Sequence, residues 1–320
     1  MNRSIRHFQD VHAHAASVAH WSQLLYSQLA AGALESSLQQ LSSEHCHAFR
    51  ERINKRVVQQ GEAPRDSVCF AVPISMPGTV RMQGRDADGS SLYFLRGGEE
   101  FMCHMPTGMD LLSIAFDRAF FDATLREVPF ADEIARLLRQ PVIKVPAQRF
   151  VECRQRLLAI FSEALVNDEM SGTAARQDEL EHALLDELLR LVMDPACDRH
   201  QRSGSSTQDF IVEKCHRMAM AETMSAPSVM ELCERLQVSR RTVQNSFRAV
   251  ADTTPLSYLR SVRLNGVRRA LMGSRAGDLT VGDAAGQWGF FHLSHFAAEY
   301  QELFGELPSQ TPRAAQWHDA

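Results

Sequence analysis

The spacing of apolar residues changes along this chain of 320 residues, and that change limits the possible folds more than any other feature. Residues 45–116 hold short apolar runs separated by turn residues about every ten positions, which is typical of strands in a small β-barrel or sandwich. Gly97 and Gly98 separate the run 91–96 from the run 99–105, which predicts a tight hairpin. From about residue 150 onward, apolar residues recur every three or four positions, which predicts helices.

Two apolar stripes follow the β-rich part, and each predicts one helix. They consist of Leu157, Leu158, Phe161 and Leu165 in the first, and of Leu180, Leu184, Leu185, Leu188, Leu189 and Val192 in the second. Such a helix pair within 150–193 either covers the barrel or forms the seam of a homodimer, and the pattern is compatible with both roles.

A polar stretch rich in Gly and Ser occupies residues 198–208, and this composition does not support a packed core. At about 150 residues per domain, the length predicts two domains. We therefore expect an N-terminal domain over 1–197, a linker over 198–208 and a C-terminal domain over 209–320.

The C-terminal part carries helix-capping residues in regular order. Ser228 and Glu231 form a capping box, Ser239 is a second N-cap, and Thr254-Pro255 begins a helix that runs to about residue 272. Thr280 then starts a short helix, and a last long one extends from about His292 to Phe304. This order predicts two helix–turn–helix units joined by one long helix. The fold class is therefore α+β, with an N-terminal β-barrel flanked by helices and an all-α C-terminal domain.

Charge is distributed unevenly. The chain has a net charge of −5, yet residues 235–275 hold nine arginines and a single acid, Asp252, which gives that segment +8. Residues 276–320 carry −5. Arginine suits bidentate contacts with phosphate and guanine, so the basic segment is a candidate nucleic-acid surface.

The first helix–turn–helix unit divides into a buried and an exposed side. Val243 and Phe247, four residues apart, are expected to seat its second helix. Polar side chains remain for the opposite face, and they are Arg240, Arg241, Gln244, Asn245 and Arg248. Arginine recognises guanine, and Gln or Asn recognises adenine, in the major groove. The pattern predicts sequence-specific binding of double-stranded DNA.

The motifs of the C-terminal part resemble those of the AraC-type (AraC/XylS) family of bacterial transcription regulators. The matching stretches are 238–247 (VSRRTVQNSF), 254–259 (TPLSYL), 263–264 (RL), 284–285 (AA), 288–296 (WGFFHLSHF) and 304–309 (FGELPS). The run 288–296 is similar to the subgroup of ethanolamine-operon regulators. The N-terminal part, with Gln28-Leu29 and 61–64 (GEAP), looks like the cupin-like effector-binding domain of that subgroup.

The resemblance implies that the second helix of each unit enters one of two successive major grooves. The implied base-reading residues are Arg240, Arg241, Gln244 and Asn245 in unit one, and His292, Ser294 and His295, beside Leu293, Ala297 and Ala298, in unit two. We expect Ser239, Arg248, Arg260 and Arg263 to contact phosphates. Unit two has Ala298 where the family has a basic residue, which predicts weaker base reading there.

The family resemblance also implies RNA polymerase as a partner. We further expect a homodimer, and an activator controlled by a small molecule in the barrel. The subgroup points to an amine or amino-alcohol. Apolar and aromatic side chains expected in the pocket or core are Phe70, Tyr93, Phe94, Phe101 and Met105.

Two other interpretations of the N-terminal part stay open. It is either a dimerisation or protein-interaction platform only, or an enzyme module of metallo-cupin type with His45, His47 and His104 as metal ligands. No carboxylate stands at a ligand spacing from these histidines, and no GxSxG, Walker or HExxH motif occurs, so we expect no metal, no cofactor and no enzyme activity.

The location of the protein is also predicted. No apolar run reaches the roughly 18 residues that cross a membrane, and the first twenty residues lack the apolar core of a signal peptide. The seven cysteines are at least 18 residues apart, which argues against a disulfide scaffold. We expect a cytoplasmic protein without a membrane partner.

Overall fold

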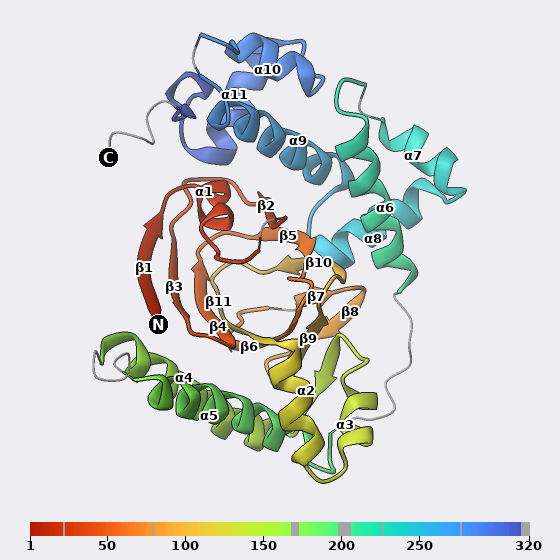
Figure 1. The fold of residues 1–320 in the computed structure, drawn as a ribbon. Helices are drawn as coiled ribbons and strands as arrows, with labels where there is room; N and C mark the ends of the chain where they lie inside the picture. The colour runs from red at the N-terminus through yellow and green to blue at the C-terminus, as the bar shows by residue number, and fades with distance from the viewer. Residues whose placement is uncertain are drawn as a thin grey trace. The chain divides into compact units, whose positions relative to one another are not determined.

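The computed structural model describes residues 1–21, 23–78, 80–167, 173–197, 206–225, 227–275 and 277–314. Strands occupy the first part of the chain and helices the last part (Figure 1). The prediction of an α+β fold with a sheet-containing N-terminal part and a helical C-terminal part is therefore confirmed.

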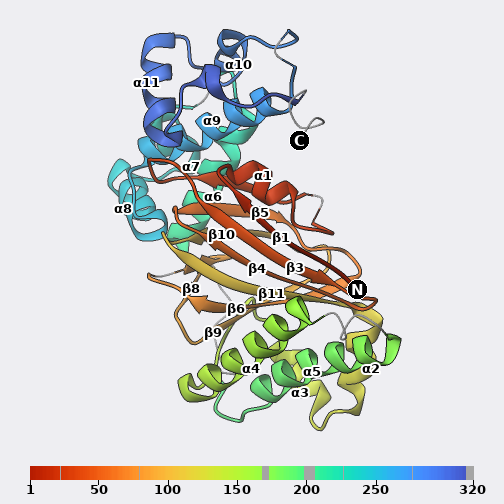
Figure 2. The ribbon, with the colours of Figure 1, turned by 90° about the vertical axis from the view of Figure 1, so that its left-hand side faces the viewer.

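The strands form two sheets. The seven-stranded sheet has the order β1-β3-β4-β11-β6-β9-β12, and β1, β3, β4 and β11 run side by side in Figure 2. Its bounds are Asn2–Phe8 (β1), Ser36–Ser42 (β3), Cys46–Ile53 (β4), Ser67–Ser75 (β6), Ser91–Arg96 (β9), Met109–Asp117 (β11) and Val142–Lys144 (β12). The five-stranded sheet has the order β2-β5-β10-β7-β8. Its bounds are Leu25–Gln28 (β2), Val57–Glu62 (β5), Val80–Met82 (β7), Arg85–Ala87 (β8) and Glu100–Met105 (β10).

The predicted hairpin at Gly97-Gly98 is wrong, although the turn itself is present. The amide of Glu99 donates to the carbonyl of Arg96 at 3.0 Å and Gly98 has φ of +78°, but β9 and β10 belong to different sheets. A Cβ on Gly97 would lie 1.9 Å from the carbonyl oxygen of Arg65. The two glycines thus let the chain pass closely over a neighbouring segment at a corner between the sheets.

Among the described residues of the N-terminal part, five α-helices accompany the sheets: Val11–Ala16 (α1), Arg118–Glu127 (α2), Ala131–Leu137 (α3), Ala147–Val166 (α4) and Ala174–Val192 (α5). Helices α4 and α5 lie side by side in both ribbon views (Figures 1 and 2). Leu157 and Phe161 of α4 and Leu184 of α5 are fully buried in one cluster with Phe70 and Ile114 of the larger sheet. The two predicted apolar stripes therefore cover one face of that sheet, since burial of this face stabilises the fold. Dimerisation through these helices stays a prediction.

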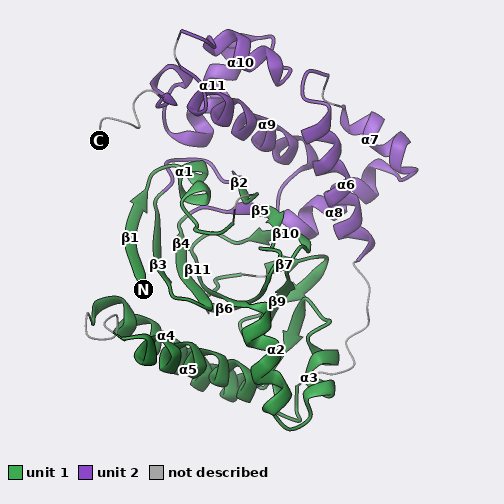
Figure 3. Ribbon diagram, viewed as in Figure 1, with its two compact units in different colours: residues 1–25, 35–54, 59–204 green, residues 26–34, 55–58, 205–320 purple. Residues whose placement is uncertain are grey.

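The residues separate into two compact units (Figure 3). Unit 1 comprises 1–25, 35–54 and 59–204, and unit 2 comprises 26–34, 55–58 and 205–320. The predicted linker, 198–208, falls mostly on residues 198–205, which lie outside the described part of the chain. Helix α6, Thr207–Ala221, begins within the predicted linker, with Ser206 as its N-cap.

Five further helices complete unit 2: Val229–Leu236 (α7), Arg240–Ala251 (α8), Pro255–Met272 (α9), Val281–Gln287 (α10) and Leu293–Phe304 (α11), followed by a 3-10 turn at Pro308–Gln310 (η2). The expected caps are present at Ser228, Ser239, Thr254 and Thr280. Gly305 ends α11 in the left-handed region with φ of +77°. Two helix pairs joined by the 18-residue α9 are therefore formed as predicted.

Two short segments from the N-terminal part of the sequence belong to unit 2. The backbone amide of Gln28 donates to Asn265 Oδ1 at 2.9 Å, and Asn265 Nδ2 donates to the Gln28 carbonyl at 2.8 Å. The Gln28 side chain donates to the carbonyls of Ala30, Gly32 and Leu303 at 2.7–2.8 Å. Residues 26–34 are thus fixed to α9 and α11 by paired, buried polar groups.

Among the described residues, no helix combines the length and apolarity that a membrane span requires. All seven cysteines are described and are free thiols. Burial raises the pKa of Cys153 and of Cys215 to about 12, so both remain thiols at neutral pH.

Candidate DNA-binding interface

The turn between α7 and α8 is short and sharply bent. Gln237 adopts a left-handed conformation with φ of +55°, and the Val238 amide donates to the Cys233 carbonyl at 3.0 Å. The Ser239 hydroxyl then accepts from the Thr242 amide at 3.1 Å, which satisfies an otherwise unpaired donor at the start of α8. The first turn of α8 is left open to solvent, as a reading helix requires.

The inner face of α8 is held by a few buried side chains. Val243 and Phe247 have no exposed surface, and the ring of Phe247 lies 5.1 Å from that of Tyr258 on α9. Ser246 is also fully buried, with its hydroxyl donating to the Thr242 carbonyl at 2.8 Å. Because this face is fixed, the opposite face of α8 must point outward.

The four residues predicted to read bases in the first helix–turn–helix pair, α7 and α8, lie on that outward face. Arg240, Arg241, Gln244 and Asn245 are all exposed, and Arg248 continues the same row one turn later. Within the described part of the chain, the guanidinium groups of Arg240, Arg241 and Arg248 form no ion pair. Their donors therefore remain available for guanine edges or phosphates.

The four predicted phosphate contacts have different environments. Ser239 caps α8, and Arg248 is exposed and unpaired in the described structure. Arg260 is exposed but forms an ion pair with Glu299 of α11, with Nη1 and Oε1 2.8 Å apart. Exposed pairs of this kind are weak, so Arg260 can exchange Glu299 for a phosphate at small cost.

Arg263 makes contacts inside the fold, and its predicted phosphate contact stays a prediction. Its Nε donates to the carbonyl oxygen of Trp288 at 2.9 Å, and its guanidinium lies over the ring of Phe290 at 4.5 Å from the centroid. Burial lowers the pKa of the guanidinium, and the neighbouring Arg260 lowers it further. Arg263 Nε and Nη2 are thus both used by the Trp288 carbonyl, and Arg263 ties α9 to the turn before α11.

Two other arginines of the basic segment, Arg268 and Arg269, have guanidinium atoms buried in the fold. Arg268 is 4% exposed, and its Nη1 lies 2.7 Å from Glu306 Oε1. Its guanidinium also lies over the ring of Phe304. Burial lowers the pKa of the Arg269 guanidinium. The charge of +8 counted from sequence thus overstates the charge that this surface presents.

The second helix pair is packed around aromatic side chains. Phe290, Phe296 and Tyr300 belong to one buried cluster with α9. Trp288 lies against Gly266 of α9, where a Cβ would come within 2.3 Å of the indole ring. Glycine at 266 therefore lets α10 and α9 approach closely.

The residues predicted to read bases in the second helix–turn–helix pair, α10 and α11, are exposed at the start of α11. They are His292, Ser294 and His295, together with Leu293 at 51% exposure. Phe291 beside them is 72% exposed. No Lys or Arg lies on α11 itself, and Glu299 on this helix pairs with Arg260. This surface is less basic than that of α8.

Sequence reasoning missed one residue that stabilises α8. Arg56 donates through Nη1 to the carbonyls of Ala251 and Asp252 at the C-terminal end of the helix, at 3.3 and 3.1 Å. Its Nη2 lies 2.7 Å from Asp252 Oδ2. A cation at a helix C-terminus is favourable both for the helix dipole and for its unpaired carbonyls. No local pattern links residues so far apart in sequence.

The five residues predicted to line the effector pocket form two groups. One group packs against the helices, and the other faces the space between the two sheets. In the pairing of β6 with β9, Phe70 lies opposite Phe94, and Ala71 lies opposite Tyr93. Phe70 and Phe94 belong to the cluster that packs against the helices. Because successive residues alternate in a strand, Tyr93 points to the other side, between the sheets. There, burial and the nearby Cys103 thiol raise the pKa of Tyr93.

The other two predicted pocket residues share the side of Tyr93. Phe101 and Met105 each lie two positions from Cys103 in β10, and therefore on the same face as Cys103. The ring of Phe101 lies 5.7 Å from that of Trp21, and Met105 Sδ lies 3.8 Å from Cys103 Sγ. Tyr93, Phe101 and Met105 therefore line the interior between the sheets.

The predicted alternative of a metal site finds no geometric support. His45 is stacked on Phe120, whereas His47 is stacked on Phe49. Burial and the neighbouring His20 lower the pKa of His47 to about 3. Among the described residues, no three His, Cys, Asp or Glu side chains are grouped as metal ligands.

Comparisons with known proteins agree with this geometry. Residues 232–314 match the family model of a helix-turn-helix domain. A XylDLEGF operon transcriptional activator of Pseudomonas putida is 38% identical over 86 residues, which is 27% of this chain and 27% of that protein. The HTH-type transcriptional regulator CdhR of Pseudomonas aeruginosa is 36% identical over 83 residues, which is 26% of this chain and 24% of that protein. The chain thus spans about a quarter of the length of these relatives.

A likeness to solved structures extends further. The AraC-like transcriptional activator CuxR is 12% identical with a TM-score of 0.45, over 91% of this chain and 100% of that chain. The family match covers most of α7 and all of α8 to α11. Residues 232–314 therefore belong to a helix-turn-helix domain.

Proposed function

We propose that unit 2 binds double-stranded DNA in a sequence-specific manner and that the protein regulates transcription, most simply as an activator. The outward face of α8 carries this proposal. Arg240, Arg241, Gln244 and Asn245 stand together on it, exposed, while Val243 and Phe247 hold the helix from behind. The major groove admits one α-helix, and these side chains match the guanine and adenine edges there.

The second helix pair supports a smaller contribution. Ser294 and His295 are exposed polar residues at the start of α11, and Leu293 offers an apolar contact for a thymine methyl group. Since α11 has no Lys or Arg, we propose that it reads mainly shape and a few bases.

A competition binding experiment tests the reading role of α8. Arg241→Ala is expected to cost about 1–3 kcal/mol of specific binding and to relax the preference at one base pair. Arg235→Ala on α7 is the matched control, because Arg235 already forms an ion pair with Glu222. Unchanged discrimination between operator and random DNA in Arg241→Ala contradicts the proposal.

We further propose that a small effector binds between the two sheets and alters DNA binding by favouring one arrangement of the chain. Tyr93 Oη, His47 Nδ1 and Trp21 Nε1 are buried and have no hydrogen-bond partner within the described structure. Buried polar groups are normally paired, so these atoms suit a polar ligand. The buried carboxylate of Glu51, next to Gln59 and His14, favours an amine or amino-alcohol.

A thermal-shift experiment tests the effector site. Ethanolamine is expected to raise the unfolding temperature of the full chain more than ethylene glycol does, because only the ammonium group pairs with Glu51. Glu51→Gln should abolish this difference. Equal shifts for both compounds, or no shift for either, contradict the amine. RNA polymerase and a second copy of this chain are the proposed macromolecular partners beside DNA.

A further inference from the structure

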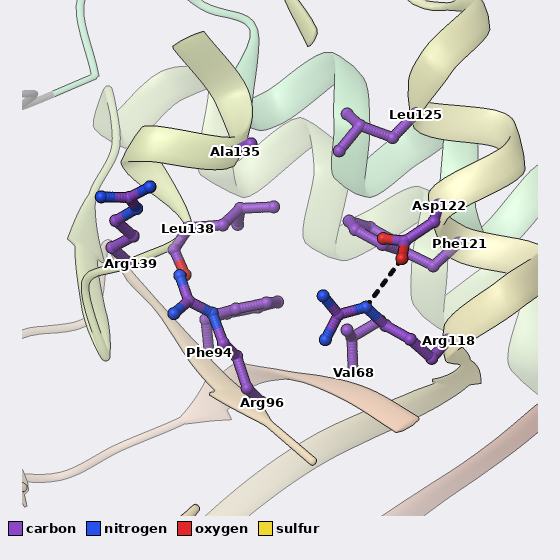
Figure 4. A pocket seen from close by; sticks show the side chains of 10 residues that line it. All are labelled: Val68, Phe94, Arg96, Arg118, Phe121, Asp122, Leu125, Ala135, Leu138 and Arg139. Carbon is purple, nitrogen blue, oxygen red and sulfur yellow. Dashed lines mark hydrogen bonds and ion pairs between the residues drawn. The ribbon is translucent and has the colours of Figure 1, made fainter. Parts of the chain in front are cut away.

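A cavity of about 280 Å³ lies on the outer side of the larger sheet, away from the inward-facing Tyr93. It is bounded by β6 and β9 on one side and by α2, α3 and the residues just after α3 on the other (Figure 4). All of its lining residues belong to unit 1. The strand that carries Tyr93 on one face carries Phe94, a residue of this cavity, on the other.

The base of the cavity is apolar. Val68, Phe94, Phe121, Leu125 and Leu138 line it, and each is at most 8% exposed. These side chains are fixed by the core behind them, because all five belong to the cluster that joins the sheet to its helices. The base therefore offers a preformed apolar surface to the body of a small molecule.

The rim of the cavity is basic. It carries Arg96, Arg118 and Arg139 and a single acid, Asp122. Arg118 Nε donates to Asp122 Oδ2 at 2.9 Å, and Arg96 Nη2 donates to the Leu138 carbonyl at 3.2 Å. In Figure 4 the guanidinium groups of Arg96 and Arg118 lie on either side of the Phe94 ring. Each guanidinium has five N–H donors, so both retain donors for a further acceptor.

We propose that this cavity binds a small organic carboxylate whose apolar body rests on Phe94 and Phe121. The excess of two positive charges on the rim repels cations and attracts an anion. A guanidinium matches a carboxylate through two parallel hydrogen bonds. An inorganic anion makes no use of the apolar base, whereas a neutral apolar molecule makes no use of the rim.

The size of the cavity limits the body of the ligand. Small-molecule sites commonly measure about 300–1,000 Å³, so this one takes a compound of one or two rings rather than a long chain. The site is separate from the interior between the sheets.

Isothermal titration of the full chain with 2-naphthoate tests the proposal. The probe combines a two-ring body with one carboxylate, and 2-naphthalenemethanol keeps the body but replaces the carboxylate with a hydroxymethyl group. We expect 2-naphthoate to bind at least about tenfold more tightly than the alcohol, since bonds between charged partners are the stronger ones. Acetate should bind more weakly than 2-naphthoate. Equal binding of 2-naphthoate and the alcohol, or no binding of 2-naphthoate at millimolar concentration, overturns the proposal.

Three variants locate the binding site. Arg118→Ala should weaken 2-naphthoate binding about tenfold. Asp122→Asn should strengthen it, because this change removes the acid that competes for Arg118. Arg136→Ala on α3 is the control, since this exposed arginine lies outside the cavity and donates to the Asp132 carbonyl. Circular dichroism verifies the fold of each variant. The site is wrong if Arg118→Ala and Arg136→Ala bind 2-naphthoate alike, or if Asp122→Asn weakens binding.

Discussion

The guanidinium of Arg263 is joined to the carbonyl oxygen of Trp288, at 2.9 Å from Nε, and covers the ring of Phe290. This contact connects the long helix α9 to the turn that precedes α11. A charged donor to a carbonyl and a cation–π contact together stabilise the position of that turn. Arg263 thus helps to fix the start of α11 relative to α9.

Arg263→Ala is accordingly expected to destabilise the protein by about 2–4 kcal/mol through loss of both contacts. Urea unfolding of the full chain measures this change. Arg260→Ala, one helical turn earlier, removes only an exposed pair with Glu299 and should change stability by less than about 1 kcal/mol. Similar stability losses in the two variants would contradict the structural role.

Arg248 should show the opposite behaviour. Arg248→Ala is expected to weaken binding to all DNA sequences alike and to make the slope of log affinity against log salt shallower by about 1, because one phosphate contact is lost. Arg260→Ala should have a smaller effect, since Glu299 already offsets its charge. Binding measured at several salt concentrations separates the two. An unchanged slope in Arg248→Ala argues against its phosphate contact.

The close approach of α9 and α10 gives a third prediction. In Gly266→Ala the new Cβ would meet the Trp288 ring, and we expect a loss of about 1–3 kcal/mol from this overpacking. Gly286→Ala is the matched control, because nothing lies within 4 Å of a Cβ there and alanine favours a helix by about 0.8–1 kcal/mol over glycine. Thermal unfolding should therefore shift in opposite directions for the two variants. A shift in the same direction contradicts the packing argument.

The fourth prediction concerns pH. Burial, with Arg269 and Arg217 nearby, lowers the pKa of His216 to about 3, and its Nδ1 lies 3.0 Å from Tyr258 Oη. Because an unfolded histidine has a pKa of about 6.5, only the unfolded state takes up this proton between pH 6.5 and 3. The free energy of unfolding should therefore fall as pH falls, by about 1.4 kcal/mol at pH 5.5 for this histidine alone.

Denaturant titrations at pH 5.5 and 7.5 measure that difference. His216→Phe should reduce the pH dependence, whereas Tyr258→Phe should lower stability at both pH values and leave the dependence in place. His47, whose pKa is also lowered to about 3, adds a similar contribution that both variants retain. If His216→Phe shows the full wild-type dependence, His216 is not the responsible group.

The helices of unit 2 could be predicted closely because their signals are local. Ser228, Ser239, Thr254 and Thr280 each cap a helix through a side chain next to the bonds it makes, and Gly305 ends one. The outward face of α8 followed from the spacing of its apolar residues. Such signals need no knowledge of the rest of the fold.

The arginines of α9 could not be assigned in the same way. Buried residues occur on several sides of this helix, among them Asn265, Gly266 and Arg268, so the sequence shows no single polar face. Whether an arginine there meets DNA, an acid or a backbone carbonyl depends on partners in α10, α11 and η2. This is why Arg263 was expected at a phosphate.

The sheets could also be predicted only in part from the sequence. Alternation predicts that Tyr93 and Phe94 point in opposite directions, but only the packed structure shows which one faces the helices. The glycines at 97–98 predict a turn correctly and a hairpin wrongly, because the partner of each strand is decided by distant segments. The contacts of Gln28 and Arg56 have no signature in the local sequence.

The hydrogen bonds between Gln28 and Asn265 bear on how this protein is dissected in the laboratory. A fragment that begins at Ser206, near the linker expected from the sequence, keeps helices α6 to α11. It omits the Gln28 backbone, which forms two hydrogen bonds with the side-chain amide of Asn265. Such a fragment would also lose Arg56 from the end of α8. A fragment that keeps all of these contacts in unit 2 therefore has to include residues 26–34 and 55–58, which lie far before α6 in the sequence.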